Sequence, residues 1–343
     1  MHTGDDHEPR SETSWTRRTW LGAAVAGALG GWCRADEPAP APPKDKAKAR
    51  LAQRPKDPDE QKEIEGVNAQ AKKAGLEGFQ TSRSTHFLAI GDAPDAFREK
   101  ALKICEKLAV EYQHHFQFKG FKLSSLPHTL TVVTLADADS FKKFSGLEAD
   151  PGVGGYYEQK TNRLVILDNR DGNQANLTQA QQANLVSLVH EASHQLTYNT
   201  GLLNREGDVP VCISEGLANY AEAWSPTRLS HLGGENIGRR QGLDLAKSQR
   251  LPWIPISKLL TDDALFQGGG GDDPALQLAY GESWLLVYQL MSKPSRIASF
   301  RDYLKAIFDR RDDKERLADA QAHLQDLDQL DKDLRIAARF PAR

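Results

Sequence analysis

The pattern of apolar and polar positions divides the chain into early strands and later helices. Short apolar and β-branched runs bounded by glycine or polar residues predict strands. These runs cover residues 85–90, 130–135, 156–159 and 163–168, the last two forming a hairpin. Apolar residues spaced three and four apart predict helices at residues 96–118, 138–144, 178–198, 213–223 and 277–291, with charged helices beyond. Strands that come early and helices that come late indicate an α+β fold.

The first 75 residues follow neither pattern. Arg17 and Arg18 precede an apolar run, residues 21–32, that is too short to span a bilayer of ~30 Å. The arrangement resembles an export signal of the twin-arginine type over residues 1–35, and an uncleaved anchor is the alternative. We therefore expect a periplasmic or extracellular protein with no stable membrane span in the mature chain.

Residues 36–75 are rich in Pro, Ala, Lys, Asp and Glu and hold almost no large apolar side chain. Such a stretch cannot bury enough surface to offset its chain entropy, so we expect a flexible linker, helical near its end.

Composition narrows the function classes. The formal net charge is −3, with both signs spread along the chain and no basic stripe with interleaved aromatic residues, so we expect no nucleic-acid partner. Cys105 and Cys212 remain if the signal is removed. They can form a disulfide or stay buried and unpaired, and we favour the unpaired state.

The candidate chemistry lies in the sequence His190-Glu191-Ala192-Ser193-His194. Positions i and i+4 lie on one face of a helix, so both imidazoles can reach a single metal ion. Glu191, next to the first histidine, is poorly directed toward that ion and can instead take a proton from a metal-bound water. The apolar run at residues 185–189 indicates a core helix rather than a solvated one.

A second motif follows after a connection that contains glycine and proline. Residues 214–222 match the pattern E-G-x-A-x-Y-x-E, and the sequence here resembles the gluzincins, zinc hydrolases that add a glutamate from the next helix to two histidines. Twenty residues separate His194 from Glu215, slightly more than in the best-known aminopeptidase branch. The chain resembles still more closely uncharacterised exported bacterial proteins of the peptidase MA-like type. These carry a Y-x-x-S-W helix downstream, which here corresponds to residues 280–284.

The resemblance implies roles for particular residues. His190, His194 and Glu215 would bind one Zn²⁺ per chain, and Glu191 would act as general base. Glu222 and Asn219 are candidates for the partner that orients a ligand histidine, and we prefer Glu222 because a carboxylate makes imidazole more basic.

A hydrolase of this kind also needs a donor to the developing oxyanion. Tyr280 is the preferred candidate; its rivals are Tyr198, Tyr220 and His231.

The same resemblance implies a zincin-like catalytic domain over residues 76–343. It would contain an α/β part (76–177), helices that carry the metal site (178–291) and C-terminal helices (292–343). In zincins an edge strand pairs with extended substrate, and either 164–168 or 154–159 is the candidate segment.

The predicted function is zinc-dependent hydrolysis of a peptide or protein substrate. A non-catalytic, zinc-stabilised binding module on the same fold is the alternative, and an exported scaffold with a coincidental motif is a third. Glu191 separates the first two, because a structural zinc site closes with four ligands and has no use for a base. The sequence does not distinguish endopeptidase from exopeptidase action, and it leaves the oligomeric state open.

Overall fold

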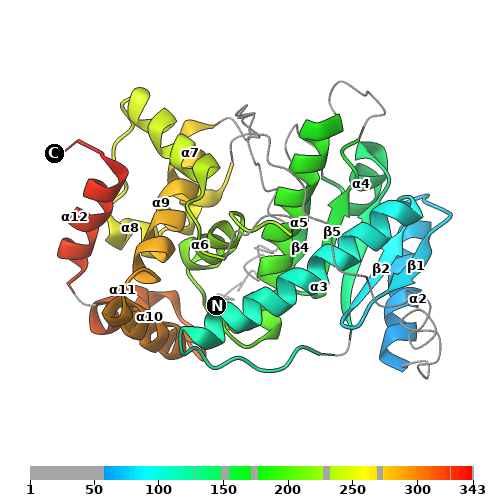
Figure 1. Cartoon of the computed structure of the whole chain (residues 1–343), viewed down its shortest axis with the longest axis horizontal. Helices are drawn as coiled ribbons and strands as arrows, with labels where there is room; N and C mark the ends of the chain where they lie inside the picture. The colour runs from blue at the N-terminus through cyan, green and yellow to red at the C-terminus, as the bar shows by residue number, and fades with distance from the viewer. Residues whose placement is uncertain are drawn as a thin grey trace, which may run out of the picture.

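The computed structural model describes residues 58–127, 129–147, 154–170, 177–226, 232–268, 273–324 and 326–341. The predicted export signal and the first part of the predicted linker therefore lie outside the described residues. Figure 1 shows a small sheet with its helices at one end of the molecule and a helical region at the other. The expected α+β fold is confirmed.

The sheet has five strands in the order β1-β2-β3-β5-β4. Their bounds are β1 Gln80–Arg83, β2 Phe87–Gly91, β3 Leu130–Leu135, β4 Gly155–Glu158 and β5 Arg163–Leu167. The three central strands run parallel, and β1 and β4 are antiparallel edges. Every residue of β2 and β3 is buried. Because successive side chains point to opposite faces, both faces of the central sheet are covered.

Helices α3 (Asp95–Phe118) and α5 (Leu177–Asn199) pack against the sheet and against each other. Helix α4 (Ala138–Ser145) contacts β3 and β5. It begins at an N-cap, Asp137, whose side chain accepts a hydrogen bond from the main chain of Ser140.

The helix expected near the end of residues 36–75 is present as α2 (Pro58–Lys73), but it packs against the folded domain instead of belonging to a flexible linker. Val67 and Ala71, four residues apart, are buried in the core, and Glu63 pairs with Arg163 at 2.6 Å. The sequence pattern did not predict this packing, because so few apolar residues anchor the helix. Strand β1 was also unpredicted: its four residues are polar or basic, and it forms by pairing with β2.

The helical region is built around α9 (Pro274–Leu290), which contacts α6, α7, α10 and α12. Its neighbours are α6 Val211–Ala221, α7 Ile237–Ser248, α8 Ile256–Thr261, α10 Pro294–Ile307, α11 Arg316–His323 and α12 Leu327–Ala338. Two 3-10 turns, η2 Asp263–Phe266 and η3 Asp313–Glu315, connect them. A helix that is apolar on nearly all sides, as α9 is, has to be surrounded by others.

Close approach between α6 and α9 depends on a glycine beside a candidate ligand. A Cβ atom on Gly216 would lie 2.5 Å from the main-chain oxygen of Ser283. The backbone of α9 can therefore lie directly against α6, which holds Glu215 on a rigid, tightly packed helix.

Cys105 and Cys212 are both buried and unpaired. Within the described residues, no helix combines the length and the apolar character that crossing a bilayer requires.

Candidate metal centre

Helices α5 and α6 bring three candidate ligands together. Nε2 of His190 lies 3.2 Å from Nε2 of His194 and 3.2 Å from Oε2 of Glu215, and the remaining edge, from His194 to Glu215, is 3.5 Å. Four ligands arranged tetrahedrally about 2.0–2.1 Å from a zinc ion lie about 3.3–3.4 Å from one another. The three donor atoms thus match three corners of such a tetrahedron.

The chemistry of these three groups fits a cation. All three side chains are buried, and together they form a group that can hold a metal ion. Oε2 of Glu215 accepts no hydrogen bond from the described residues although it is shielded from solvent. A buried carboxylate oxygen without a hydrogen-bond donor is costly, and a metal ion would remove that cost.

Glu222, the residue that follows α6, contacts the first histidine of the metal group. Its Oε1 lies 2.7 Å from Nδ1 of His190, on the side of the ring away from Glu215. Asn219 does not take this role: its side-chain amide donates to the main-chain oxygen of Tyr280 at 3.2 Å.

Ser214 holds the second histidine, a contact that the sequence did not predict. Its Oγ lies 3.2 Å from Nδ1 of His194 and 3.3 Å from the hydroxyl of Tyr198. The ring of Tyr157 is stacked against those of both His194 and Tyr198. The only signal for Ser214 in the sequence is its position, one residue before Glu215 on the same helix.

Negative charge gathers around the two imidazoles. Burial raises the pKa of Glu191, and the neighbouring histidines oppose that rise. Burial acts in the same direction on Glu215, but both imidazoles hold the pKa of its carboxyl well below the usual range. For His190, burial lowers the pKa, but the carboxylates of Glu215 and Glu222 beside its two ring nitrogens outweigh it and raise the pKa to about 9. A cluster of this sign attracts a cation.

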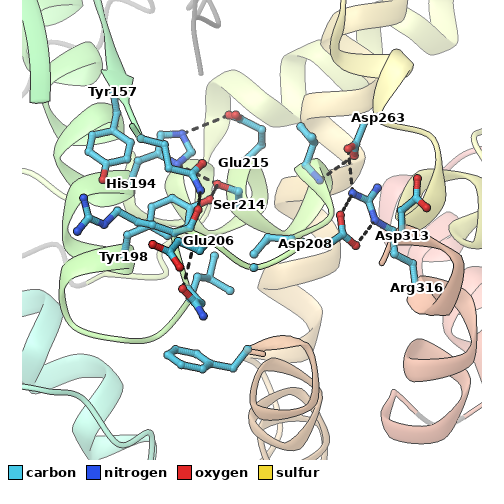
Figure 2. Close-up of a pocket in the computed structure, with 18 of the residues that line it drawn as sticks. Tyr157, His194, Tyr198, Glu206, Asp208, Ser214, Glu215, Asp263, Asp313 and Arg316 are labelled. Carbon is cyan, nitrogen blue, oxygen red and sulfur yellow. Dashed lines mark hydrogen bonds and ion pairs between the residues drawn. The ribbon is translucent and has the colours of Figure 1, made fainter. Parts of the chain in front are cut away.

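The three candidate ligands, His190, His194 and Glu215, form the metal group, and this group lines a cleft of about 1260 Å³. Figure 2 shows His194 and Glu215 at one end and Asp208, Asp263 and Arg316 at the other. Glu191 also lines this cleft, so a molecule bound there can reach both the metal group and its neighbouring carboxylate.

Partly buried ion pairs fix the connection between the two helices that carry the ligands. Arg316 pairs with both Asp208 and Asp263. Asp263 in turn accepts a hydrogen bond from the main chain of Val211, the first residue of α6, at 3.0 Å. The start of α6, and hence the placement of Glu215, is tied to the C-terminal helices.

The two strand segments suggested as substrate partners differ in position. Residues 164–168 cannot serve, because β5 lies between β3 and β4 and both of its edges are already paired. Strand β4 is at the edge of the sheet, and Tyr157 and Gln159 from this segment line the cleft.

The candidate oxyanion donors also differ in whether they line the cleft. Tyr280 lines the cleft, with its ring against Phe266 and under the guanidinium of Arg239. Tyr198 lines it too. Tyr220 does not: its hydroxyl lies 3.0 Å from Nε2 of His115. His231 lies outside the described residues.

Part of the chain matches a known protein-family model. Residues 184–311 match a family model described as a protein of unknown function (DUF1570). No curated protein gives a significant match. The matched segment runs from within α5 to just beyond α10, so it contains all three candidate ligands, Glu191 and Tyr280. The part of this chain that carries the metal group is therefore similar to a family whose function is unknown.

Proposed function

We propose that this chain is an exported zinc-dependent hydrolase that cleaves peptide bonds. The observation that carries the proposal is the set of three donor atoms, from His190, His194 and Glu215, separated by 3.2–3.5 Å beside Glu191 in an open cleft. Export is supported by the Arg17-Arg18 pair and the apolar run that follows it.

The donor set supports zinc. Two imidazoles and one carboxylate are the ligands of catalytic zinc sites that keep a fourth position for water or substrate. Thiolate ligands, which softer metals prefer, do not contribute to the group. A zinc ion bound here would supply an acidified water and polarise the carbonyl group of the substrate.

The chain's own residues would carry the proton and the developing charge. Glu191 accepts a proton from the attacking water and delivers it to the amine that leaves. The main chain of Tyr157 lies close enough to the Glu191 carboxyl to lower its pKa, against the rise that burial causes. Tyr280 donates a hydrogen bond to the oxyanion.

The shape of the cleft supports an extended peptide or protein substrate. β4 borders the cleft, and among the described strands it pairs with β5 alone. Its free edge offers main-chain hydrogen bonds to an added strand. Side chains of the substrate would then alternate between the floor of the cleft and solvent.

The test is cleavage of a broad peptide library by the purified chain loaded with zinc, alongside Glu191→Gln. We expect cleavage by the wild type and a loss of roughly 10²–10⁴-fold in the variant, with its zinc retained. Glu206→Gln is the matched control, because Glu206 lines the same cleft, is exposed and is not part of the metal group. Zinc binding by both proteins without any cleavage would favour the non-catalytic binding module instead.

A further inference from the structure

We propose that Arg239 is a positioning residue of the metal centre, acting on His190 through Glu222. The inference rests on the proposed metal centre and adds to it a residue that lies outside the cleft. Arg239 is on α7, a helix with no recognised motif, and its side chain is almost completely buried.

The contacts form a chain of three residues. Nε of Arg239 donates to Oε2 of Glu222 at 3.0 Å, and Nη2 donates to Oε1 at 2.6 Å. Oε1 is also the atom that lies 2.7 Å from Nδ1 of His190. A fork that engages both carboxylate oxygens fixes the plane of the carboxylate, and the carboxylate then fixes the plane of the imidazole.

Asn236 completes the support of Glu222. Its side-chain amide donates to Oε2 of Glu222 at 2.6 Å and to the main-chain oxygen of Asn219 at 2.9 Å. Its Oδ1 accepts from the main-chain N–H of Arg239 and so caps the start of α7. One side chain therefore attaches the first turn of α7 to the end of α6, which sets where the Arg239 fork lies.

Two glycines let α7 and α9 approach closely enough for Arg239 to reach Glu222. A Cβ atom on Gly281 would lie 2.8 Å from the side chain of Leu243 and 3.1 Å from the main-chain oxygen of Arg239. A Cβ atom on Gly242 would lie 3.3 Å from the main-chain oxygen of Gln277. At this crossing the guanidinium of Arg239 also covers the ring of Tyr280, 5.0 Å from its centroid.

Arg239 also supplies the positive charge that pairs with the buried carboxylate of Glu222. The side chain of Glu222 is buried, and so are two other carboxylates of this region, Glu191 and Glu215. A buried carboxylate without a paired charge is strongly destabilising, and Arg239 contacts both oxygens of Glu222. A lysine would supply the charge but only a single point of contact, so it could not fix both oxygens.

The neighbouring residue offers a matched control. Arg240 is on the same helix and its guanidinium also lies over an aromatic ring of α9, that of Trp284, at 5.3 Å. It bonds to Glu235 and to the main-chain oxygen of Ala337, away from the metal group. Arg240→Met thus removes the same kind of side chain and the same kind of ring contact.

The experiment measures the zinc dissociation constant of the whole chain by competition with a chelator. The variants are Arg239→Met, Arg239→Lys, Arg240→Met, Glu222→Gln and the double variant Glu222→Gln/Arg239→Met. We expect Arg239→Met to weaken zinc binding roughly 10–100-fold, Arg239→Lys to have a smaller effect, and Arg240→Met to have none. If Arg239 acts through Glu222, the double variant should bind zinc no more weakly than Glu222→Gln alone.

Two further readouts separate positioning from a general loss of structure. Circular dichroism of the zinc-free proteins checks that each variant is folded. The visible absorption of the cobalt-substituted proteins reports ligand geometry, and we expect it to change in Arg239→Met and not in Arg240→Met. If Arg239→Met fails to fold, Arg239→Lys carries the test.

Several outcomes would overturn the inference. One is unchanged zinc affinity in Arg239→Met, or in Arg239→Lys if that variant carries the test. Another is a double variant whose loss of zinc affinity equals the sum of the losses in Arg239→Met and Glu222→Gln. If the wild type bound no zinc, the proposed metal centre itself would fail, which is a different result from a zinc-binding wild type that does not respond to Arg239.

Discussion

Glu222 lies 2.7 Å from Nδ1 of His190, while Nε2 of the same ring points at Glu215. An ionised carboxylate can only accept a hydrogen bond, so this contact places the imidazole proton on Nδ1. In the neutral form of the ring, Nε2 then carries the lone pair, directed toward the other two candidate ligands. Glu222 thus selects the tautomer of His190 that can bind a metal ion.

Replacing Glu222 with glutamine should weaken zinc binding roughly 10–100-fold, because the neutral amide holds the Nδ1 proton less strongly and lowers the basicity of the ring. Chelator competition on purified protein measures the effect. Glu235→Gln is the control, since Glu235 is an exposed partner of Arg240. Equal affinities in Glu222→Gln and wild type would show that Glu222 has no influence on the ligand.

Tyr280→Phe should lower turnover by roughly 10²–10³-fold and leave zinc content unchanged, as expected when one oxyanion donor is lost. The phenylalanine keeps the ring that contacts Phe266 and Arg239, so packing is preserved. Tyr198→Phe, in the same cleft, should have a smaller effect. Steady-state kinetics on a cleaved peptide decides between the two, and a large loss confined to Tyr198→Phe would transfer the role to Tyr198.

Gly216→Ala should destabilise the fold by about 1–3 kcal/mol, because the added methyl group overpacks the contact between α6 and α9. Its Cβ atom would meet main-chain oxygen, which cannot rotate away. Gly238→Ala is the control, since a Cβ atom there meets only Asn236 Oδ1, at 3.5 Å. Denaturant unfolding of both variants should show a loss of stability for Gly216→Ala alone.

Glu282 should make stability depend on pH. Burial raises the pKa of its carboxyl well above the ordinary value of 4.5, and its Oε2 has no hydrogen-bond partner among the described residues. Between the ordinary pKa and the raised one, the folded chain keeps a proton that the unfolded chain has released. The free energy of unfolding therefore falls as pH rises through that range.

Glu282→Gln removes this titration. The stability of the variant relative to wild type should rise as the pH increases above about 4.5, and urea unfolding at several pH values measures the difference. A difference that stays constant with pH would mean that Glu282 does not hold its proton in the folded state.

The residues of the metal group could be predicted from sequence because their relationship is mostly local. His190 and His194 share a face through helical spacing alone, and Glu215 stands in a second motif one helix later. The strands were found where buried runs are apolar, as at residues 130–135.

Residues whose roles arise from tertiary packing could not be predicted. Arg239 lies on a short helix containing Gly238 and Gly242, which weaken helical propensity, and nothing in its sequence connects it with Glu222. The packing of helix α2 could not be predicted, because its few buried residues, such as Val67, find their partners only in the folded protein.

The most direct test of the metal centre is the zinc content of the purified chain after zinc loading and removal of excess metal, measured beside Glu215→Ala. We predict about one zinc per chain in the wild type and a large loss in the variant, which keeps both histidines but lacks the third ligand. A wild-type chain that retains no metal, or a variant that retains as much as the wild type, would contradict the account.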